Sequence, residues 1–215
     1  MLLSIERSSS LGSAALFSEN GKLICAGSET ASSRHGGDAF SAVKALLDES
    51  GANLNEIRRF AVGIGPGSFS GIRSAIAFLE GLAIPIGARV EGVGSAHAAA
   101  HVFRKAAPEF AGDAVAVVGD ARRGHIWIGI YKPGDSPQEV ELVDRADLAA
   151  AIPADADVIT PDWDRLGGFL LELFSPARLH QSLPTAEAVG ELALAGFAVP
   201  SVPLYMHRAV EPAVS

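Results

Sequence analysis

Apolar residues recur along the chain in short runs that predict β-strands, separated by turn residues or by segments with helical periodicity. Residues 2–5, 13–17 and 23–27 predict three strands, and Asn20-Gly21 indicates a tight hairpin between the last two. Apolar positions three and four apart predict helices over residues 38–50, 72–83, 96–105, 163–174 and 185–195. Further strands are predicted over residues 59–64, 89–93, 114–119, 125–131 and 158–160. A β-meander followed by alternating helices and strands predicts an α/β chain with a mixed sheet.

Two of the predicted helices have more apolar surface than one face of a sheet would cover. The helix over residues 38–50 carries apolar residues in more than one stripe: Ala39, Phe40, Ala42, Val43, Leu46 and Leu47. In the helix over residues 72–83, one face carries Ile72, Ala75, Ile76, Leu79 and Ala83, and the other carries Gly71, Ser74, Phe78, Gly81 and Leu82. A helix that is apolar nearly all round is buried on both sides. We therefore expect each helix to lie between the sheet and a second element, which belongs either to this chain or to a partner.

A glycine-rich turn connects the predicted strand at residues 59–64 to the helix that follows it. Its sequence is Gly65-Pro66-Gly67-Ser68-Phe69-Ser70-Gly71. Proline fixes φ, and the glycines permit conformations that other residues avoid. Ser68 and Ser70 are both good N-caps for the helix. Such a junction can bind an anion on its free N–H groups, or it can be a plain turn, since the lysine of a P-loop is absent.

Composition limits the function classes. The 215 residues are 48% hydrophobic and 20% charged, which permits a sizeable core. The net charge of −8 disfavours RNA binding by this chain alone, because phosphate contacts require clustered lysine and arginine. Cys25 is the one cysteine, which excludes an internal disulfide, and its apolar strand predicts a buried, inert thiol. No apolar run is expected to approach membrane-span length, and a reducing cytoplasm is the simplest location.

Five motifs, in order along the chain, resemble those of one protein family. The run from Gly65 to Arg73 resembles the G-P-G-S-F-T-G-L-R signature of the TsaB (YeaZ) family. Residues 5–8 lie where that family has I-D-T-S, and Arg34-His35 precedes the first helix at the expected distance. Residues 119–127 resemble D-A-R-x-G-x-V-Y, and residues 203–208 resemble P-x-Y-L-R. The residues taken as family-motif positions are Gly65, Pro66, Gly67, Ser68, Phe69, Gly71, Arg73, Asp120 and Arg122.

The resemblance implies an actin-like ATPase (ASKHA) superfold, an α/β fold of two RNase H-like subdomains with mixed sheets. Residues 1–102, joined by residues from about 185 to 215, would form the first subdomain, and residues 103–184 the second, smaller one. It also implies a role in making threonylcarbamoyladenosine on tRNA, as a non-catalytic subunit that pairs with the transferase TsaD and the ATPase TsaE. No catalytic residue, cofactor or metal is then expected in this chain, and tRNA would be met only through the complex.

Pairing in this family uses the first two helices, which form a helix bundle with TsaD. The two helices with excess apolar surface, at residues 38–50 and 70–83, occupy those positions. The residues expected at the partner interface are Phe40, Val43, Leu47, Phe69, Ser70, Gly71, Ser74 and Phe78. Without TsaD, the same surface is expected to form a two-fold homodimer.

The chain departs from the family pattern at Glu6 and Arg7, where the family has Asp and Thr. In nucleotide-binding relatives, an acidic residue and a hydroxyl at this strand end hold metal and phosphate. The longer glutamate and the arginine therefore argue against productive ATP binding. Asp120 is expected to cap a turn rather than to bind a metal. Arg122 and Arg123 form either a solvated hairpin tip or a contact for phosphate or carboxylate.

An enzyme is the alternative, either an ATP-dependent phosphotransferase of the same superfold or a metallopeptidase. His97 and His101, four residues apart on a predicted helix, would place both imidazoles on one face, as in many metal sites. No glutamate lies between them, and no third ligand is evident. His35 is expected to be a loop histidine, and Trp127 to pack in a strand rather than to bind a base. Tight binding of ATP and magnesium by the isolated chain would favour the enzyme.

Overall fold

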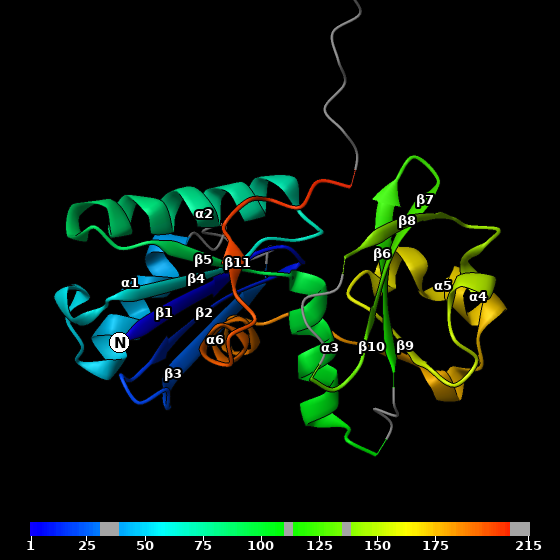
Figure 1. The fold of residues 1–215 in the computed structure, drawn as a ribbon, viewed down its shortest axis with the longest axis horizontal. Coiled ribbons are helices and arrows are strands. Elements are labelled where there is room, and N and C mark those ends of the chain that lie inside the picture. Colours follow the sequence, from blue (N-terminus) through cyan, green and yellow to red (C-terminus); the bar gives the residue numbers. More distant parts are fainter. Residues whose placement is uncertain (31–38, 110–113, 135–138, 207–215) are drawn as a thin grey trace, which may run out of the picture.

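The chain folds into two lobes, each built on one β-sheet (Figure 1). The structure, a computed structural model, describes residues 1–30, 39–109, 114–134 and 139–206. Helix α3 (Ser95–Ala106) lies between the lobes and connects the first sheet to the second along the chain (Figure 1).

The first sheet has six strands in the order β11-β5-β4-β1-β2-β3. The strands are β1 (Leu2–Glu6), β2 (Leu11–Phe17), β3 (Leu23–Thr30), β4 (Arg59–Gly63), β5 (Val90–Val93) and β11 (Val199–Pro200). β1, β2 and β3 form the predicted antiparallel meander, whereas β1, β4 and β5 are parallel. β1 is central and buried at every position, including its two polar residues, Ser4 and Glu6.

The second sheet repeats this topology with five strands in the order β10-β9-β6-β7-β8. The strands are β6 (Val115–Arg122), β7 (His125–Tyr131), β8 (Glu141–Asp144), β9 (Asp157–Thr160) and β10 (Leu179–Gln181). β6, β7 and β8 form an antiparallel meander, and β6, β9 and β10 are parallel. Two such RNase H-like lobes make up the actin-like ATPase superfold, so the predicted fold class is confirmed.

Helices cover both faces of the first sheet (Figure 1). α1 (Ala39–Ser50) and α2 (Phe69–Ala83) pack on one face, and α6 (Ala186–Leu194) packs on the other. α4 (Leu148–Ala151) and α5 (Trp163–Leu173) pack on the second sheet, whose opposite face meets α3. Three short 3-10 helices complete the described elements: η1 (Leu54–Glu56), η2 (Ile84–Ile86) and η3 (Pro176–Arg178).

The helix boundaries follow the caps that the sequence offers. Ser68 is the N-cap of α2, and its Oγ accepts a hydrogen bond from the Gly71 N–H (3.3 Å). α2 therefore begins at Phe69, three residues earlier than predicted. Gly51 follows α1 with φ of +69°, the left-handed conformation expected of a C-terminal glycine.

β8, β10 and β11 were not predicted from the sequence. Each is two to four residues long and lies at the edge of its sheet. In strands this short, pairing with a neighbour decides the conformation, and the local sequence pattern carries little signal.

One helical stretch of the described residues, Phe69–Ile86, is long and apolar enough to cross a membrane by length and composition alone. The expectation that no run would reach this length was therefore wrong. The buried residues of α2 are those of its predicted inner face: Ile72, Ala75, Ile76, Leu79 and Ala83. They pack against the first sheet, as in the core helix of a globular protein.

Candidate functional site

A cavity of about 840 Å³ lies between segments of the two lobes. The first lobe lines it with residues 8–10 and with the start of α2, and the second lobe lines it with the β6–β7 hairpin and the start of α5. Residues 204–206 complete the lining. The motif residues that line it are Gly67, Ser68, Phe69, Arg73, Asp120 and Arg122. Segments that are far apart in the sequence and that carry the family motifs therefore meet at one site.

Hydrogen bonds hold the turn from Gly65 to Ser68 at both of its ends. Gly65 and Ser95 exchange two hydrogen bonds: the Gly65 N–H donates to Ser95 Oγ (3.0 Å), and the Ser95 N–H donates to the Gly65 carbonyl (2.8 Å). At the other end, the Ser68 N–H donates to the Ser8 carbonyl (2.6 Å). A Cβ at Gly67 would lie 2.2 Å from the Ser8 carbonyl oxygen, so this approach requires glycine. Two N–H groups of the turn are thus already used by the chain itself.

Aromatic side chains stand at the rim of the cavity. Phe69 is 57% exposed, and its ring centre lies 5.3 Å from that of Tyr205. The guanidinium carbon of Arg73 lies 4.9 Å from the centre of the Phe69 ring, within cation–π distance. Residues 204–206 are held beside this site because the Leu204 N–H donates to the Ile64 carbonyl (2.8 Å).

The β6–β7 hairpin turn is capped by Asp120, as predicted. Asp120 Oδ1 accepts a hydrogen bond from the Arg122 N–H (3.0 Å), and Asp162 Oδ2 accepts one from the Asp120 N–H (2.9 Å). Arg122 and Arg123 have φ of 70° and 53° and are exposed at the hairpin tip. Arg165 Nη1 lies 3.8 Å from Asp120 Oδ2, so the carboxylates of the site face arginines. Burial is the main cause that raises the pKa of Asp162 above its ordinary value.

Trp127 packs in the sheet, as predicted, rather than presenting its ring to solvent. It is only 2% exposed, and a Cβ at Gly119 would lie 2.0 Å from its ring. The glycine opposite Trp127 in β6 therefore makes the space that the indole fills.

Glu6 is fully buried, and its carboxyl group is bonded within the chain. Oε1 accepts a hydrogen bond from the Ser8 N–H (2.6 Å), and Oε2 accepts one from the Ser95 hydroxyl (2.8 Å). Desolvation is the largest cause acting on it and raises the pKa of Glu6 above its ordinary value, against the hydrogen bonds from Ser8 and Ser95. Sequence reasoning did not identify Ser95, because only the fold brings the start of α3 to the end of β1.

His97 and His101 both lie on α3, but their rings have different surroundings. The His97 ring stacks on Tyr131 at 5.1 Å between ring centres and meets the Phe197 ring edge-on. His101 Nε2 lies 2.6 Å from Glu191 Oε2. In the part of the chain that the structure describes, no group of three His, Cys, Asp or Glu residues is arranged to hold a metal ion. The two histidines are therefore accounted for by ring packing around His97 and by the contact of His101 with Glu191, which joins α3 to α6.

The outer sides of α1 and α2 form the helix face, the surface at which a partner is expected. Four of the expected residues are exposed there: Phe40, Phe69, Ser70 and Ser74. Val43 was assigned to this face wrongly, because it is 4% exposed and packs in the core beneath α1. A Cβ at Gly71 would lie 2.1 Å from the Arg7 carbonyl oxygen, so its small size serves packing within this chain, and its place at the interface stays a prediction.

The helix face differs from the predicted one in two further respects. Leu47 and Phe78 are half-buried and pack partly against the core of the first lobe. Ala77 and Ile84 are exposed along α2 and η2 and had not been assigned to this face, whereas Gly81, also exposed, had been placed on it. Their spacing from Ser74, at steps of three or four residues, is the helical signal that could have identified them.

Cys25 is half-buried, with Sγ 3.6 Å from the Leu46 carbonyl oxygen, and burial chiefly raises the pKa of its thiol. A raised pKa lowers the thiolate fraction, in agreement with an inert thiol. Arg34, His35 and the part of the closing motif at residues 207–208 lie outside the described residues.

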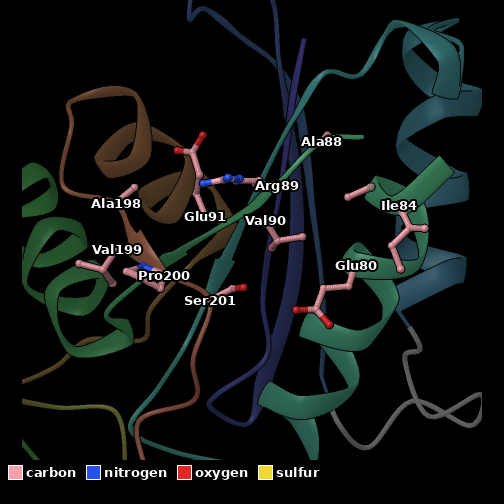
Figure 2. Close-up of a pocket in the computed structure, with 11 residues that line it drawn as sticks. Glu80, Ile84, Ala88, Arg89, Val90, Glu91, Ala198, Val199, Pro200 and Ser201 are labelled. Atoms are coloured by element: carbon pink, nitrogen blue, oxygen red, sulfur yellow. The ribbon is translucent and has the colours of Figure 1, made fainter. Parts of the chain in front are cut away.

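A second cavity, of about 570 Å³, lies at the C-terminal end of α2 (Figure 2). Glu80 and Ile84 line it from α2 and η2, residues 88–91 from β5 and the loop before it, and residues 198–201 from around β11. None of the described residues of the family motifs lines this cavity. Ile84 is 75% exposed beside it, so the apolar surface of α2 extends to this end of the helix.

Comparison with known proteins agrees with these motifs. Residues 28–150, more than half of the chain, match the family described as TsaD: tRNA N6-adenosine threonylcarbamoyltransferase. A Pseudomonas aeruginosa structure described as an uncharacterized protein with similarity to peptidase YeaZ is 26% identical, with a TM-score of 0.74; the match covers 96% of this chain and 99% of that one.

The structure of YeaZ from Pseudomonas aeruginosa is also 26% identical, with a TM-score of 0.73, over 95% of this chain and 98% of that one. A search of curated protein sequences found no match. The chain therefore belongs to the TsaD family of tRNA-modification proteins and is a TsaB/YeaZ-like member of it.

Proposed function

We propose that this chain is a non-catalytic subunit of the complex that makes threonylcarbamoyladenosine on tRNA, where it pairs with a TsaD-type transferase and a TsaE-type ATPase. The observation that carries the proposal is the outer side of α2. Its inner side already covers the sheet, yet its outer side exposes small and apolar residues: Phe69, Ser70, Ser74, Ala77, Gly81 and Ile84. Small residues allow a second helix to approach closely, and large exposed apolar residues favour being covered by it.

The partner surface on TsaD is accordingly an apolar helix or helix pair. α1 lies beside α2 on the same face of the sheet and contributes Phe40, which is 63% exposed. Together the two helices would complete a helix bundle with the partner, in which their outer sides become buried.

The proposal that this chain is not itself catalytic rests on Glu6, at the end of β1. The Glu6 carboxyl group is buried and engaged by Ser8 and Ser95, so it does not face a ligand in the cavity between the lobes. We expect the isolated chain to bind ATP weakly, to hydrolyse it negligibly and to transfer no threonylcarbamoyl group. Its contribution would be to favour the competent conformation of TsaD by binding that conformation more tightly.

The net charge of −8 supports contact with tRNA only through the assembled complex, which would work in the cytoplasm. The proposal is tested by co-elution of the chain with the TsaD homologue of the same organism in size-exclusion chromatography. A stable complex is expected, and two separate peaks at micromolar concentrations of both proteins would contradict the proposed pairing.

Without the partner, we expect the chain to form a two-fold homodimer through α1 and α2. The exposed apolar residues on this face are then covered by their own copies, since a two-fold axis brings the same surface of both chains together. Sedimentation velocity at micromolar concentration should give the mass of a dimer. A strict monomer over this range would count against self-association by the helix face.

Replacing both His97 and His101 with alanine should leave tRNA modification by the reconstituted complex within about twofold of wild type, which is under roughly half a kcal/mol in activation free energy. The reason is that both rings are engaged in contacts within the chain, with Tyr131, Phe197 and Glu191. The assay measures threonylcarbamoyladenosine formed per minute, beside a check that the variant still assembles. Loss of activity with assembly intact would move the chemistry onto this chain and would favour the metallopeptidase-like alternative.

A further inference from the structure

We infer that Glu6 is a positioning residue whose buried carboxyl group closes a ring of hydrogen bonds around the turn from Gly65 to Ser68. The ring fixes this turn, and hence the start of α2, relative to α3, the helix between the lobes. This inference goes beyond the proposed function, and its tests use the isolated chain without a partner.

The ring can be followed bond by bond. From Glu6, Oε2 accepts the hydroxyl hydrogen bond of Ser95 (2.8 Å), and Ser95 holds Gly65 by two reciprocal bonds (3.0 and 2.8 Å). From the other carboxyl oxygen, Oε1 accepts the N–H of Ser8 (2.6 Å), and the Ser8 carbonyl accepts the N–H of Ser68 (2.6 Å). The two oxygens of one carboxyl group therefore hold both ends of the turn.

The surroundings of Glu6 are built for this side chain. A Cβ at Gly63 would lie 1.8 Å from Glu6 Oε2, so the absence of a side chain on β4 makes the space that the carboxyl group occupies. The groups that affect its ionisation are the buried environment and hydrogen bonds from Ser8, Ser95 and the Arg7 backbone, and no charged side chain of the described residues contributes. A neutral side chain of the same shape should therefore replace it.

The ring of hydrogen bonds affects the position of two helices, α2 and α3. Ser68 is the N-cap of α2, so the turn sets where the exposed helix face begins. Ser95 is the first residue of α3, which packs against β6 and β7 of the second lobe and against α6 of the first. Glu6 thereby couples the orientation of α3 to the start of α2.

Hydrogen exchange of the isolated chain tests the inference, with the amides of Ser8, Gly65, Ser68 and Ser95 as reporters. Glu6→Ala and Glu6→Asp should speed exchange at Gly65 and Ser8 about tenfold, which corresponds to ~1.4 kcal/mol. Aspartate is included because it is shorter by one methylene group and should not reach both Ser8 and Ser95. Glu6→Gln should keep exchange within about twofold of wild type, because its amide has the same shape: its oxygen can accept the Ser8 N–H, and its NH2 group can donate to Ser95 Oγ in place of the bond from that hydroxyl.

Two further substitutions disrupt the same ring of hydrogen bonds and leave Glu6 unchanged. Ser95→Ala should speed exchange at Gly65 about tenfold but leave Ser8 protected, and Gly63→Ala should expose both, since its methyl group displaces the carboxyl group. Ser68→Ala is the matched control: it removes the α2 cap and should affect Gly71 rather than Gly65. Two kinds of result would overturn the inference. The first is exchange at Gly65 that stays within twofold of wild type in Ser95→Ala or in a folded Glu6→Ala. The second is a loss of protection in Glu6→Gln equal to that in Glu6→Ala. If Glu6→Ala does not fold, Glu6→Asp decides.

Discussion

Replacing Ser74 with glutamate should abolish co-elution of the chain with its TsaD-type partner. Ser74 lies in the middle of the exposed side of α2, and its hydroxyl donates only to the Gly71 carbonyl one turn earlier (2.9 Å). In the proposed helix bundle, a carboxylate at this position would be buried without a counter-charge. The cost is roughly several kcal/mol, which weakens binding by about 100-fold or more.

The isolated Ser74→Glu variant should fold as wild type does, because position 74 is exposed in the free chain. Ser28→Glu is the matched control, because Ser28 is exposed and lies on the edge strand β3. Its pairing partner, Ser13, has its hydroxyl toward α6, on the side of the sheet opposite to α1 and α2. The control therefore adds the same charge away from the helix face. The control should co-elute normally. If Ser74→Glu co-elutes as wild type does, the helix face is not the interface.

Replacing Trp127 with alanine should lower the free energy of unfolding by about 3–5 kcal/mol. The indole is buried between α3 and the second sheet, and Gly119 opposite it leaves the space that the ring occupies. Alanine would leave a cavity there, and the neighbouring strands cannot close it because they are fixed by pairing with each other. Chemical denaturation followed by circular dichroism measures the loss.

Trp163 provides the matched comparison because it is the other tryptophan of the chain and is only half-buried. It begins α5 and packs against Gly167, where a Cβ would lie 3.1 Å from the ring. Trp163→Ala should therefore cost less than half as much as Trp127→Ala. Equal losses for the two variants would contradict the assignment of Trp127 to the core of the second lobe.

The sequence predicted the inner side of α2 residue by residue, because burial against a sheet follows the helical period directly. It did not predict that Gly71 is small to admit the Arg7 backbone, since that contact joins two segments about sixty residues apart. Val43 was assigned to the wrong side for a related reason. When a helix is apolar on all sides, its sequence does not show whether a given residue faces the sheet or a partner.

The motifs around Gly65 and Asp120 could be recognised from the sequence, whereas the cavity that brings them together depends on how the two sheets face each other. The same holds for the ring around Glu6. Its members come from β1, the following turn, the glycine-rich turn and the start of α3, and no local pattern links them. The sequence shows that residue 6 is Glu where the family has Asp, but it does not show that the Glu6 carboxyl group bonds both Ser8 and Ser95.

The central claim is that this chain makes a TsaD-type transferase competent without performing the chemistry. The most direct test is the rate of threonylcarbamoyladenosine formation on tRNA by TsaD-type and TsaE-type proteins with the activated donor, measured with and without this chain. We predict product only when this chain is present, and none from this chain alone with donor and tRNA. Full activity of the other two proteins without it, or product formed by this chain alone, would contradict the account.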